Sequence, residues 1–100
     1  MDKKYEKCSR MMKALGDDTR IRIFDMLSEE ELCACKILEK FSITQPTLSY
    51  HMKILCDSGL VAVRKDGIWM KYSVNKENLD CLREFLDKAW TKGGLRNDNI

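Results

Sequence analysis

The spacing of apolar residues changes along this 100-residue chain, and that change limits the folds it can adopt. From residue 3 to residue 59, apolar side chains recur every three or four positions, as they do on one face of a helix. From Leu60 to Val74 they alternate with polar ones around Asp66-Gly67, a strong signal for a tight hairpin turn. Helical spacing returns after Asn75. We therefore predict a mainly α fold with a β-hairpin.

Four helices are predicted before the hairpin, each with a start or stop signal. The first helix, residues 3–15, is followed by Gly16, which is a stop signal. Asp17 or Asp18 can cap the second helix, and Ser28 and Glu31 form a capping box for the third. Thr44 can cap a fourth helix that ends at Ser58-Gly59. Asn75 can cap a last helix that runs to Trp90. This order of four helices, two strands and one helix predicts a winged helix-turn-helix.

The hairpin is expected to present one face to the core. A two-residue loop at Asp66-Gly67 would pair Arg64 with Trp69 and Val63 with Met70. One face would then carry Val61, Val63, Met70 and Tyr72 toward the core, and the other Arg64, Trp69 and Lys71.

Composition narrows the class of protein. The chain is short enough for one domain, predicted at residues 1–90, followed by a polar, flexible tail at residues 91–100. It has no apolar run that could span a membrane and no signal peptide, so we expect a cytoplasmic protein without a membrane partner.

The single histidine, His51, has no catalytic triad around it, so an enzyme is not expected. The net charge of +2 means that any nucleic-acid binding depends on where the charges lie.

Three segments carry a resemblance to a known family. Residues 15–23 (LGDDTRIRI), 45–55 (QPTLSYHMKIL) and 58–61 (SGLV) together resemble the ArsR/SmtB family of winged-helix metalloregulatory repressors. The resemblance runs from about residue 5 to residue 90, with the hairpin in register. It implies a homodimer formed through the first and last helices. Such a dimer binds double-stranded operator DNA without a cofactor and leaves it when an inducer binds.

A cysteine motif narrows the resemblance further. Glu31-Leu32-Cys33-Ala34-Cys35 is similar to the motif of the branch that senses arsenite, antimonite, or cadmium and lead. The resemblance implies that Cys33 and Cys35 bind the inducer, with As(III) or Sb(III) favoured. Some arsenic sensors have a further cysteine where this chain has Leu38. Related cadmium and lead sensors supply a cysteine from the partner subunit near the position of Cys8, so a Cd(II)/Pb(II) sensor that also uses Cys8 is the alternative.

The residues themselves support soft-ion binding and leave other roles open. Two thiolates favour soft ions over hard ones. Positions two apart on a regular helix point about 200° from each other, so we hypothesise that ion binding unwinds residues 31–35 and displaces the fourth predicted helix, which would read DNA. Cys33 and Cys35 could instead be buried apolar residues, an oxidisable redox-sensing pair, or the remnant of a decayed site. Cys56 and Cys81 are interpreted as a spectator and as dimer packing.

The fourth predicted helix has a polar face suited to reading DNA. With Leu48, Met52 and Leu55 directed inward, the outward side chains are Gln45, Thr47, Ser49, Tyr50 and Lys53. Amide and hydroxyl groups bind base edges or phosphates, and lysine binds phosphate or guanine. Further contacts are predicted for Arg64, Lys65 and Lys71 on the hairpin, whereas His51 is either packed or a phosphate contact.

Overall fold

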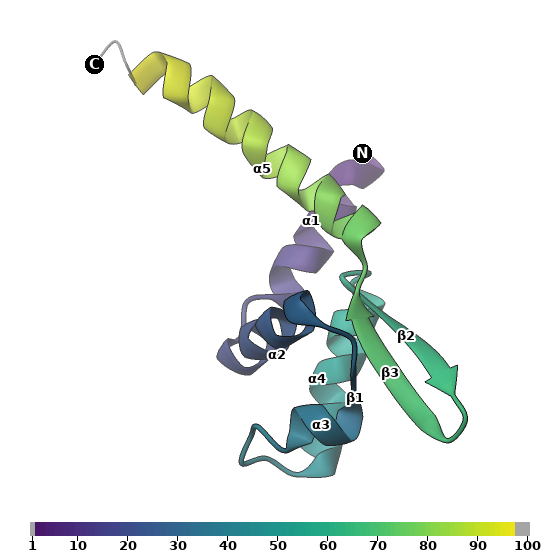
Figure 1. Cartoon of the computed structure of the whole chain (residues 1–100). Coiled ribbons are helices and arrows are strands. Elements are labelled where there is room, and N and C mark those ends of the chain that lie inside the picture. The colour runs from purple at the N-terminus through teal and green to yellow at the C-terminus, as the bar shows by residue number, and fades with distance from the viewer. Residues whose placement is uncertain (1, 98–100) are drawn as a thin grey trace.

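The computed structural model describes residues 2–97, and the side chains of residues 2–92. Its elements are α1 (Lys3–Ala14), α2 (Asp18–Glu29), β1 (Leu32–Cys33), α3 (Ala34–Leu38), α4 (Gln45–Asp57), β2 (Val61–Asp66), β3 (Trp69–Val74) and α5 (Lys76–Asn97). Helices α2, α3 and α4 cluster at one end of the molecule, the β2–β3 hairpin projects beside them, and α5 runs away from this body past α1 (Figure 1). The winged helix-turn-helix predicted from the sequence is confirmed.

Side-chain caps fix the starts of three helices where the sequence predicts them. The Asp17 carboxylate accepts from the backbone N–H of Arg20 at 3.1 Å, which caps α2. The Thr44 hydroxyl accepts from the N–H of Thr47 at 3.3 Å, which caps α4. The Asn75 side chain accepts from the N–H of Asn78 at 3.0 Å at the start of α5. These caps satisfy backbone donors that have no partner within the helix.

The predicted capping box for the third helix is wrong. Ser28 lies inside α2, where its hydroxyl donates to the Asp25 carbonyl at 2.6 Å. The chain is extended at residues 32–33 because β1 pairs with β3, with Leu32 opposite Tyr72. Pairing with a distant strand overrides the local helix signal, so α3 begins only at Ala34 and is five residues long.

The three strands form an antiparallel sheet in the order β1-β3-β2. The predicted hairpin register is wrong by two positions, because Asp66 pairs with Trp69 and the loop is Gly67-Ile68. Gly67 has φ +64°, and no non-glycine residue described has a positive φ. That combination matches a type II′ turn, which places glycine at its first central position, rather than the expected type I′.

Only the base of the hairpin packs on the core. Val61 is buried, whereas Val63 is 43% exposed and Met70 44% exposed, so these two residues do not reach the core as predicted. The reason is that the hairpin extends past the helices (Figure 1), and its outer half borders a cavity instead of the packed core. Its tip therefore forms an exposed wing.

The core lies where α1, α2, α4 and the base of the sheet meet. Met11, Ile23, Leu55 and Leu60 are fully buried there, and Ile37 of α3 joins them. Leu48 and Met52 hold the inner face of α4 against this core, as predicted.

Helix α5 is longer than predicted. It continues through Gly93 and Gly94 to Asn97, because glycine weakens a helix by about 1 kcal/mol relative to alanine without forbidding it. The domain boundary at residue 90 and the flexibility of the tail stay predictions, and residues 98–100 lie outside the described part. No helix within residues 2–97 is both long and apolar enough to cross a membrane.

Candidate functional site

Helix α4 presents the polar face that the sequence predicts. Gln45, Thr47, Ser49 and Lys53 are all exposed, and Tyr50 is 62% exposed. The Thr44 hydroxyl donates to that of Thr47 at 2.9 Å, so the first turn is ordered by its own side chains. With its inner face held in the core, this helix displays amides, hydroxyls and one lysine on a rigid support.

His51 does not belong to this face. It is 9% exposed, and its Nδ1 lies 3.1 Å from Nη1 of Arg20. Nδ1 is also 4.0 Å from the Asp17 carboxylate. The Arg20 Nε in turn donates to the Ala14 carbonyl at 2.7 Å. His51 therefore ties the back of α4 to the start of α2, and the packed interpretation suits it better than a phosphate contact.

Sequence reasoning assigned no role to Arg20, although it joins three parts of the chain. Its partner His51 is 31 positions away, so no local spacing could reveal the contact. Its guanidinium contacts the end of α1 and the inner side of α4. Arg20 thus supports α4 on the side opposite its exposed polar face.

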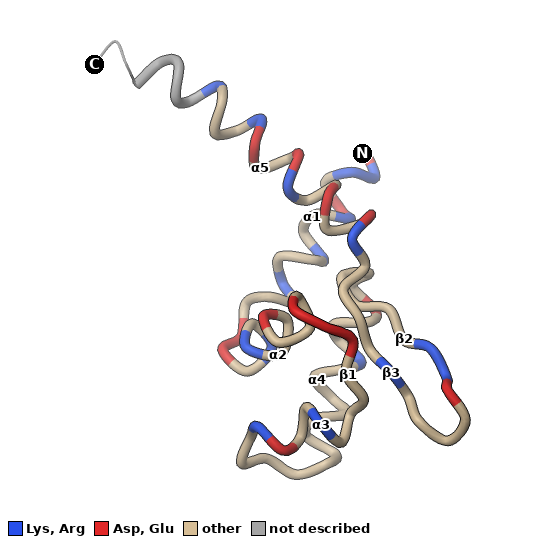
Figure 2. Tube along the Cα trace, viewed as in Figure 1, with Lys and Arg blue, Asp and Glu red and all other residues tan. Residues whose placement is uncertain are grey.

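The basic side chains near α4 and the wing are mostly paired with acidic ones. Lys53 lies 3.0 Å from Asp57, and Lys71 lies 3.5 Å from Asp66. Lys65 is exposed and has no ion pair in the described part of the chain. Figure 2 shows the basic positions of β2 and β3 close to the acidic residue at the end of β2. The positive surface is therefore local and partly neutralised.

Arg64 makes a bidentate ion pair that sequence reasoning missed. Its Nε and Nη2 donate to the two Glu31 carboxylate oxygens at 2.8 and 2.7 Å. This hydrogen bonding lowers the pKa of Glu31 and raises the pKa of Arg64. The pair connects the wing to the segment just before β1, two residues from Cys33.

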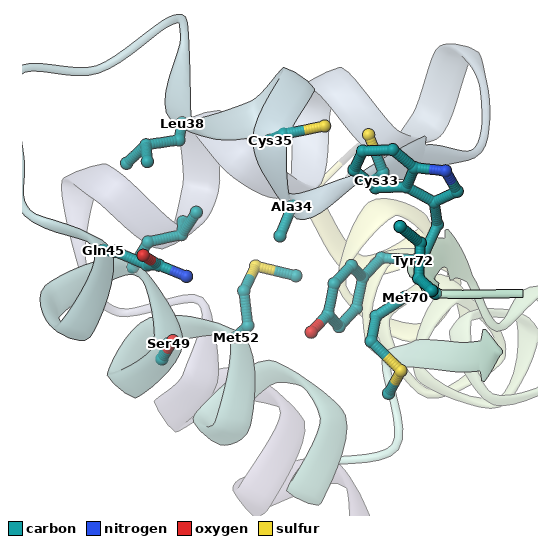
Figure 3. A pocket seen from close by; sticks show the side chains of 12 residues that line it. Cys33, Ala34, Cys35, Leu38, Gln45, Ser49, Met52, Met70 and Tyr72 are labelled. Atoms are coloured by element: carbon teal, nitrogen blue, oxygen red, sulfur yellow. The ribbon is translucent and has the colours of Figure 1, made fainter. Parts of the chain in front are cut away.

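Cys33 and Cys35 lie next to each other in the structure. Cys33 has an extended backbone (φ −80°, ψ 160°) as the N-cap of α3, and Cys35 is in the first turn. Figure 3 shows their sulfurs turned toward each other. The Cys35 thiol hydrogen-bonds to Cys33 and lowers the pKa of Cys33, with a further contribution from the Lys36 N–H. The same contact raises the pKa of Cys35. Cys33 is therefore the more acidic of the two thiols.

A cavity of about 330 Å³ joins this thiol pair to α4. It lies between α3, α4 and the wing, and Figure 3 shows Met52 and Tyr72 between α4 and the cysteine segment. Gln45 and Ser49 of the exposed face of α4 also line it. A ligand held by the thiols would therefore lie beside two side chains that face solvent on α4.

The other cysteines lie elsewhere. Cys8 is 3% exposed within the core and lines a separate cavity with Cys81, between α1 and α5. Cys56 is half-buried at the end of α4, and burial raises its pKa. Within the described residues, no group of three histidine, cysteine or carboxylate side chains could hold a metal ion. Cys33 and Cys35 offer two adjacent soft ligands, a donor set that suits a thiophilic ion.

Comparison with known sequences finds regulatory proteins. The model of the "Bacterial regulatory protein, arsR family" matches residues 17–63. An "Arsenical resistance operon repressor" from Staphylococcus xylosus is 48% identical over 83 residues, covering 83% of this chain and 80% of that protein. Its namesake from Staphylococcus aureus is 50% identical over 76 residues, covering 76% and 73%. A "Cadmium resistance transcriptional regulatory protein" homolog from Staphylococcus aureus is 34% identical over 83 residues, covering 82% and 66%.

Comparison with solved structures finds the same fold. An "ArsR-like Transcriptional Regulator" from Rhodococcus matches with a TM-score of 0.81 at 22% identity, covering 96% of this chain and 91% of that one. A "homodimeric winged helix-turn-helix DNA-binding domain" from Mycobacterium bovis, solved by NMR, matches with a TM-score of 0.71 at 26% identity, covering 93% and 85%. The first is named a transcriptional regulator, and the second is described as a possible one.

Proposed function

This chain belongs to the ArsR family of bacterial regulatory proteins, and on that premise we propose that it is a homodimeric transcriptional repressor that releases its operator when As(III) or Sb(III) binds Cys33 and Cys35. It would act in the cytoplasm, where operator DNA lies. The observation that carries the proposal is the cavity shared by the thiol pair and the recognition helix.

The geometry of α4 and the wing supports binding to double-stranded DNA. The side chains of Gln45, Thr47, Ser49 and Tyr50 are exposed on one helix and would read base edges or bind phosphates. The basic groups Lys53, Arg64, Lys65 and Lys71 would bind phosphates around them. In a two-fold dimer, two such helices would meet the major groove about one helical turn apart.

The thiol geometry supports a soft inducer ion and revises the expected mechanism. Because α3 begins at Ala34, Cys33 is outside the helix and its sulfur can approach that of Cys35. Both could therefore bind one ion without the unwinding of residues 31–35 that a regular helix would require. Binding of As(OH)₃ would form two As–S bonds and break two As–O bonds, and the thiol protons would leave with the hydroxides as water.

Three connections could carry the effect of the ion to DNA. The ion would lie in the cavity that Gln45 and Ser49 also line. The Cys33 backbone pairs with Lys71 of the wing. The Glu31–Arg64 ion pair holds a candidate phosphate-binding group beside the cysteine segment. A shift of the thiols would therefore move groups on both DNA-binding elements. By linkage, DNA would weaken ion binding by the same factor.

The first test is fluorescence anisotropy of the dimer on its upstream DNA. Arsenite, antimonite and cadmium are titrated with a phosphine reductant, since dithiol reductants would bind the ions. We expect saturating arsenite to weaken DNA binding by about 5- to 150-fold, the usual range for allosteric coupling. The Cys33→Ser/Cys35→Ser protein should bind DNA equally well with and without arsenite.

Two single variants serve as matched controls. Cys56→Ser should respond like the wild type, because burial raises the pKa of that thiol and it lies apart from the pair. Cys8→Ser should keep the arsenite response. If it loses only the cadmium response, Cys8 is a ligand of a Cd(II)/Pb(II) sensor. The same operator affinity with and without every ion would refute an ion sensor, and release by peroxide that reductant reverses would indicate a redox sensor instead.

A second prediction concerns the acidic partner of Lys53. Asp57→Asn removes a negative charge beside the recognition helix and breaks the 3.0 Å ion pair, which is worth only about 0–1 kcal/mol because both groups are exposed. Lys53 then becomes available to phosphate. We expect DNA affinity to rise about twofold to fivefold at about 50 mM salt, and the gain to shrink at high salt through screening.

The matched control is Asp87→Asn, which breaks a similar i, i+4 ion pair with Arg83 on α5. That pair is outside the proposed DNA face, so affinity should stay within twofold of the wild type. Equal gains from both variants would indicate a general effect of net charge, and no gain from Asp57→Asn would place Lys53 away from phosphate.

A further inference from the structure

The tip of the wing carries the most exposed large apolar side chain among residues 2–92. Ile68 is 85% exposed, and the two residues that follow it, Trp69 and Met70, are 50% and 44% exposed. A Cβ atom added at Gly67 would meet no atom within 4 Å, so the turn stands clear of the rest of the chain. Turns are built mainly from polar residues, whereas contiguous exposed apolar side chains mark contact surfaces. The tip is therefore a candidate contact surface.

Basic side chains stand directly behind this tip. Lys65 lies opposite Met70 in the ladder, is exposed, and forms no ion pair within the part of the chain whose side chains are described. Arg64 and Lys71 lie opposite each other one position further back. Asp66, next to the turn, is itself paired with Lys71 at 3.5 Å. An apolar tip backed by cations suits duplex DNA, which has a charged exterior and an apolar stack of bases inside.

The tip also lies on the side of the molecule that α4 would present to DNA. Ile68 lines the same cavity as Gln45 and Ser49 of α4, and Figure 1 shows α4 and the hairpin extending toward the same end of the molecule. With α4 in the major groove, a projection beside it would meet the adjacent minor groove, which is about 6 Å wide. Paired strands are already about 4.8 Å apart before their side chains are added, so the turn can enter this groove and the ribbon behind it cannot.

Resting on the proposed function, we infer that Ile68 of each protomer inserts from the minor groove between two stacked base pairs beside the segment read by α4. Isoleucine is one of the apolar side chains that act as such wedges in DNA-bending proteins. The insertion unstacks one base step and bends the duplex toward its major groove. Lys65 binds a phosphate close to the same step.

This contact predicts a sequence preference at base pairs that form no hydrogen bond with the tip. TA and CA/TG steps are the most easily kinked and unstacked, so the steps beneath the two wing tips should favour them. In a two-fold dimer these steps are arranged symmetrically about the centre of the operator. The wing would thus read how easily the DNA deforms, while α4 reads base edges.

The experiment measures base stacking and bending on the upstream DNA bound by the full-length dimer. Footprinting first locates the protected duplex. The fluorescent base 2-aminopurine is then placed at successive positions across it, because its fluorescence rises when it is unstacked. Energy transfer between dyes at the two ends of the duplex reports bending, and anisotropy gives the affinity for the same duplexes.

We expect 2-aminopurine fluorescence to rise at one step on each side of the operator centre, and each insertion to bend the duplex by about 20° to 90°. Ile68→Ala should abolish the rise, reduce the bend, and lower affinity by at least about fivefold, comparable with the loss of one base contact. Ile68→Leu should restore all three, because leucine also acts as a wedge. Replacing the flexible step by a G·C-rich one should weaken binding by the wild type more than by Ile68→Ala.

Two controls separate insertion from a general loss of structure. Gly67 keeps its positive φ in both Ile68 variants, so urea unfolding should match the wild type. Ile21→Ala removes the same atoms from α2, where Ile21 is 52% exposed, and should change neither fluorescence, bend nor affinity.

The outcomes separate this inference from the proposed function. If the dimer binds DNA but no position gains fluorescence, or if the gain persists in Ile68→Ala, the wedge is refuted and the repressor stands. Loss of affinity in Ile68→Ala without unstacking in the wild type also refutes insertion. If Ile68→Ala changes self-association in sedimentation but leaves DNA binding intact, the tip is a protein contact instead. If the wild type does not bind its upstream DNA, the proposed function itself fails.

Discussion

Raising the salt concentration from about 50 to about 200 mM is expected to weaken operator binding by about 10³- to 10⁴-fold. Each protomer offers four basic side chains on α4 and the wing, namely Lys53, Arg64, Lys65 and Lys71. A dimer that uses most of them makes about six to eight phosphate contacts, and each contact releases condensed counterions. Three of the four form ion pairs within the protomer. If those pairs persist on DNA, fewer phosphates are contacted, and the loss of affinity with salt falls toward the lower end of this range.

Anisotropy titrations at four salt concentrations would measure the slope of the logarithm of the binding constant against the logarithm of the salt concentration. Lys65→Ala should reduce it by about two for the dimer, one contact per protomer, because each phosphate contact contributes about 0.9. Lys88→Ala on α5 changes the same net charge away from the proposed face and should leave the slope unchanged. Affinity that is flat with salt would rule out these side chains as phosphate contacts.

Leu55→Ala is expected to lower the free energy of unfolding by about 2–5 kcal/mol, because it empties a fully buried position. Leu55 lies on the inner face of α4, within the core shared with α1 and α2. A domain of this size is stabilised by about 5–15 kcal/mol in total, so the loss is a large fraction. The recognition helix would lose part of its support at the same time.

Urea unfolding followed by circular dichroism would measure the loss, with both proteins at the same protomer concentration because dimerisation adds to stability. Ile21→Ala is the matched control. Its side chain is 52% exposed on α2, so the same kind of truncation should cost less than about 1 kcal/mol. Equal losses in the two variants would mean that Leu55 has no special place in the core.

Much of the fold could be predicted because its signals are local. Helix α4 begins at the residue after Thr44 and buries Leu48, Met52 and Leu55, since a cap and a three-to-four spacing specify it without help from elsewhere. Its exposed face follows directly from that spacing. The same is true of the start of α5 at Asn75.

The parts that could not be predicted depend on distant contacts. Residues 28–31 have the pattern of a capping box, but strand pairing of Leu32 with Tyr72 and the ion pair of Glu31 with Arg64 extend the chain instead. These partners are far away in sequence, and no local preference indicates them. The adjacency of Cys33 and Cys35 follows from this extension, which is why a regular helix gave the wrong geometry for the thiol pair.

Hairpin register was mispredicted for a more subtle reason. Asp66-Gly67 favours a type I′ turn, but shifting the loop by one residue to Gly67-Ile68 keeps glycine at the positive φ and lets Asp66 pair with Trp69. Both registers place Val61 and Tyr72 on the same face, so alternation alone cannot distinguish them. The cost of the shift is an exposed Ile68 at the tip.

The corner between the end of α4 and the start of α5 is held by short contacts that would affect how the proposed dimer matches its DNA. Gly59 has φ +89°, its carbonyl accepts from the Asn78 side chain at 2.8 Å, and the Asn75 N–H donates to the Leu60 carbonyl at 2.8 Å. Helix α5 has 22 residues and is therefore about 33 Å long. A rotation of about 5° at this corner would move its far end by about 3 Å, close to the rise of one base pair. In the proposed dimer, the phase of the two half-sites on the double helix would thus depend on the angle of a corner that lies outside the proposed DNA-binding face.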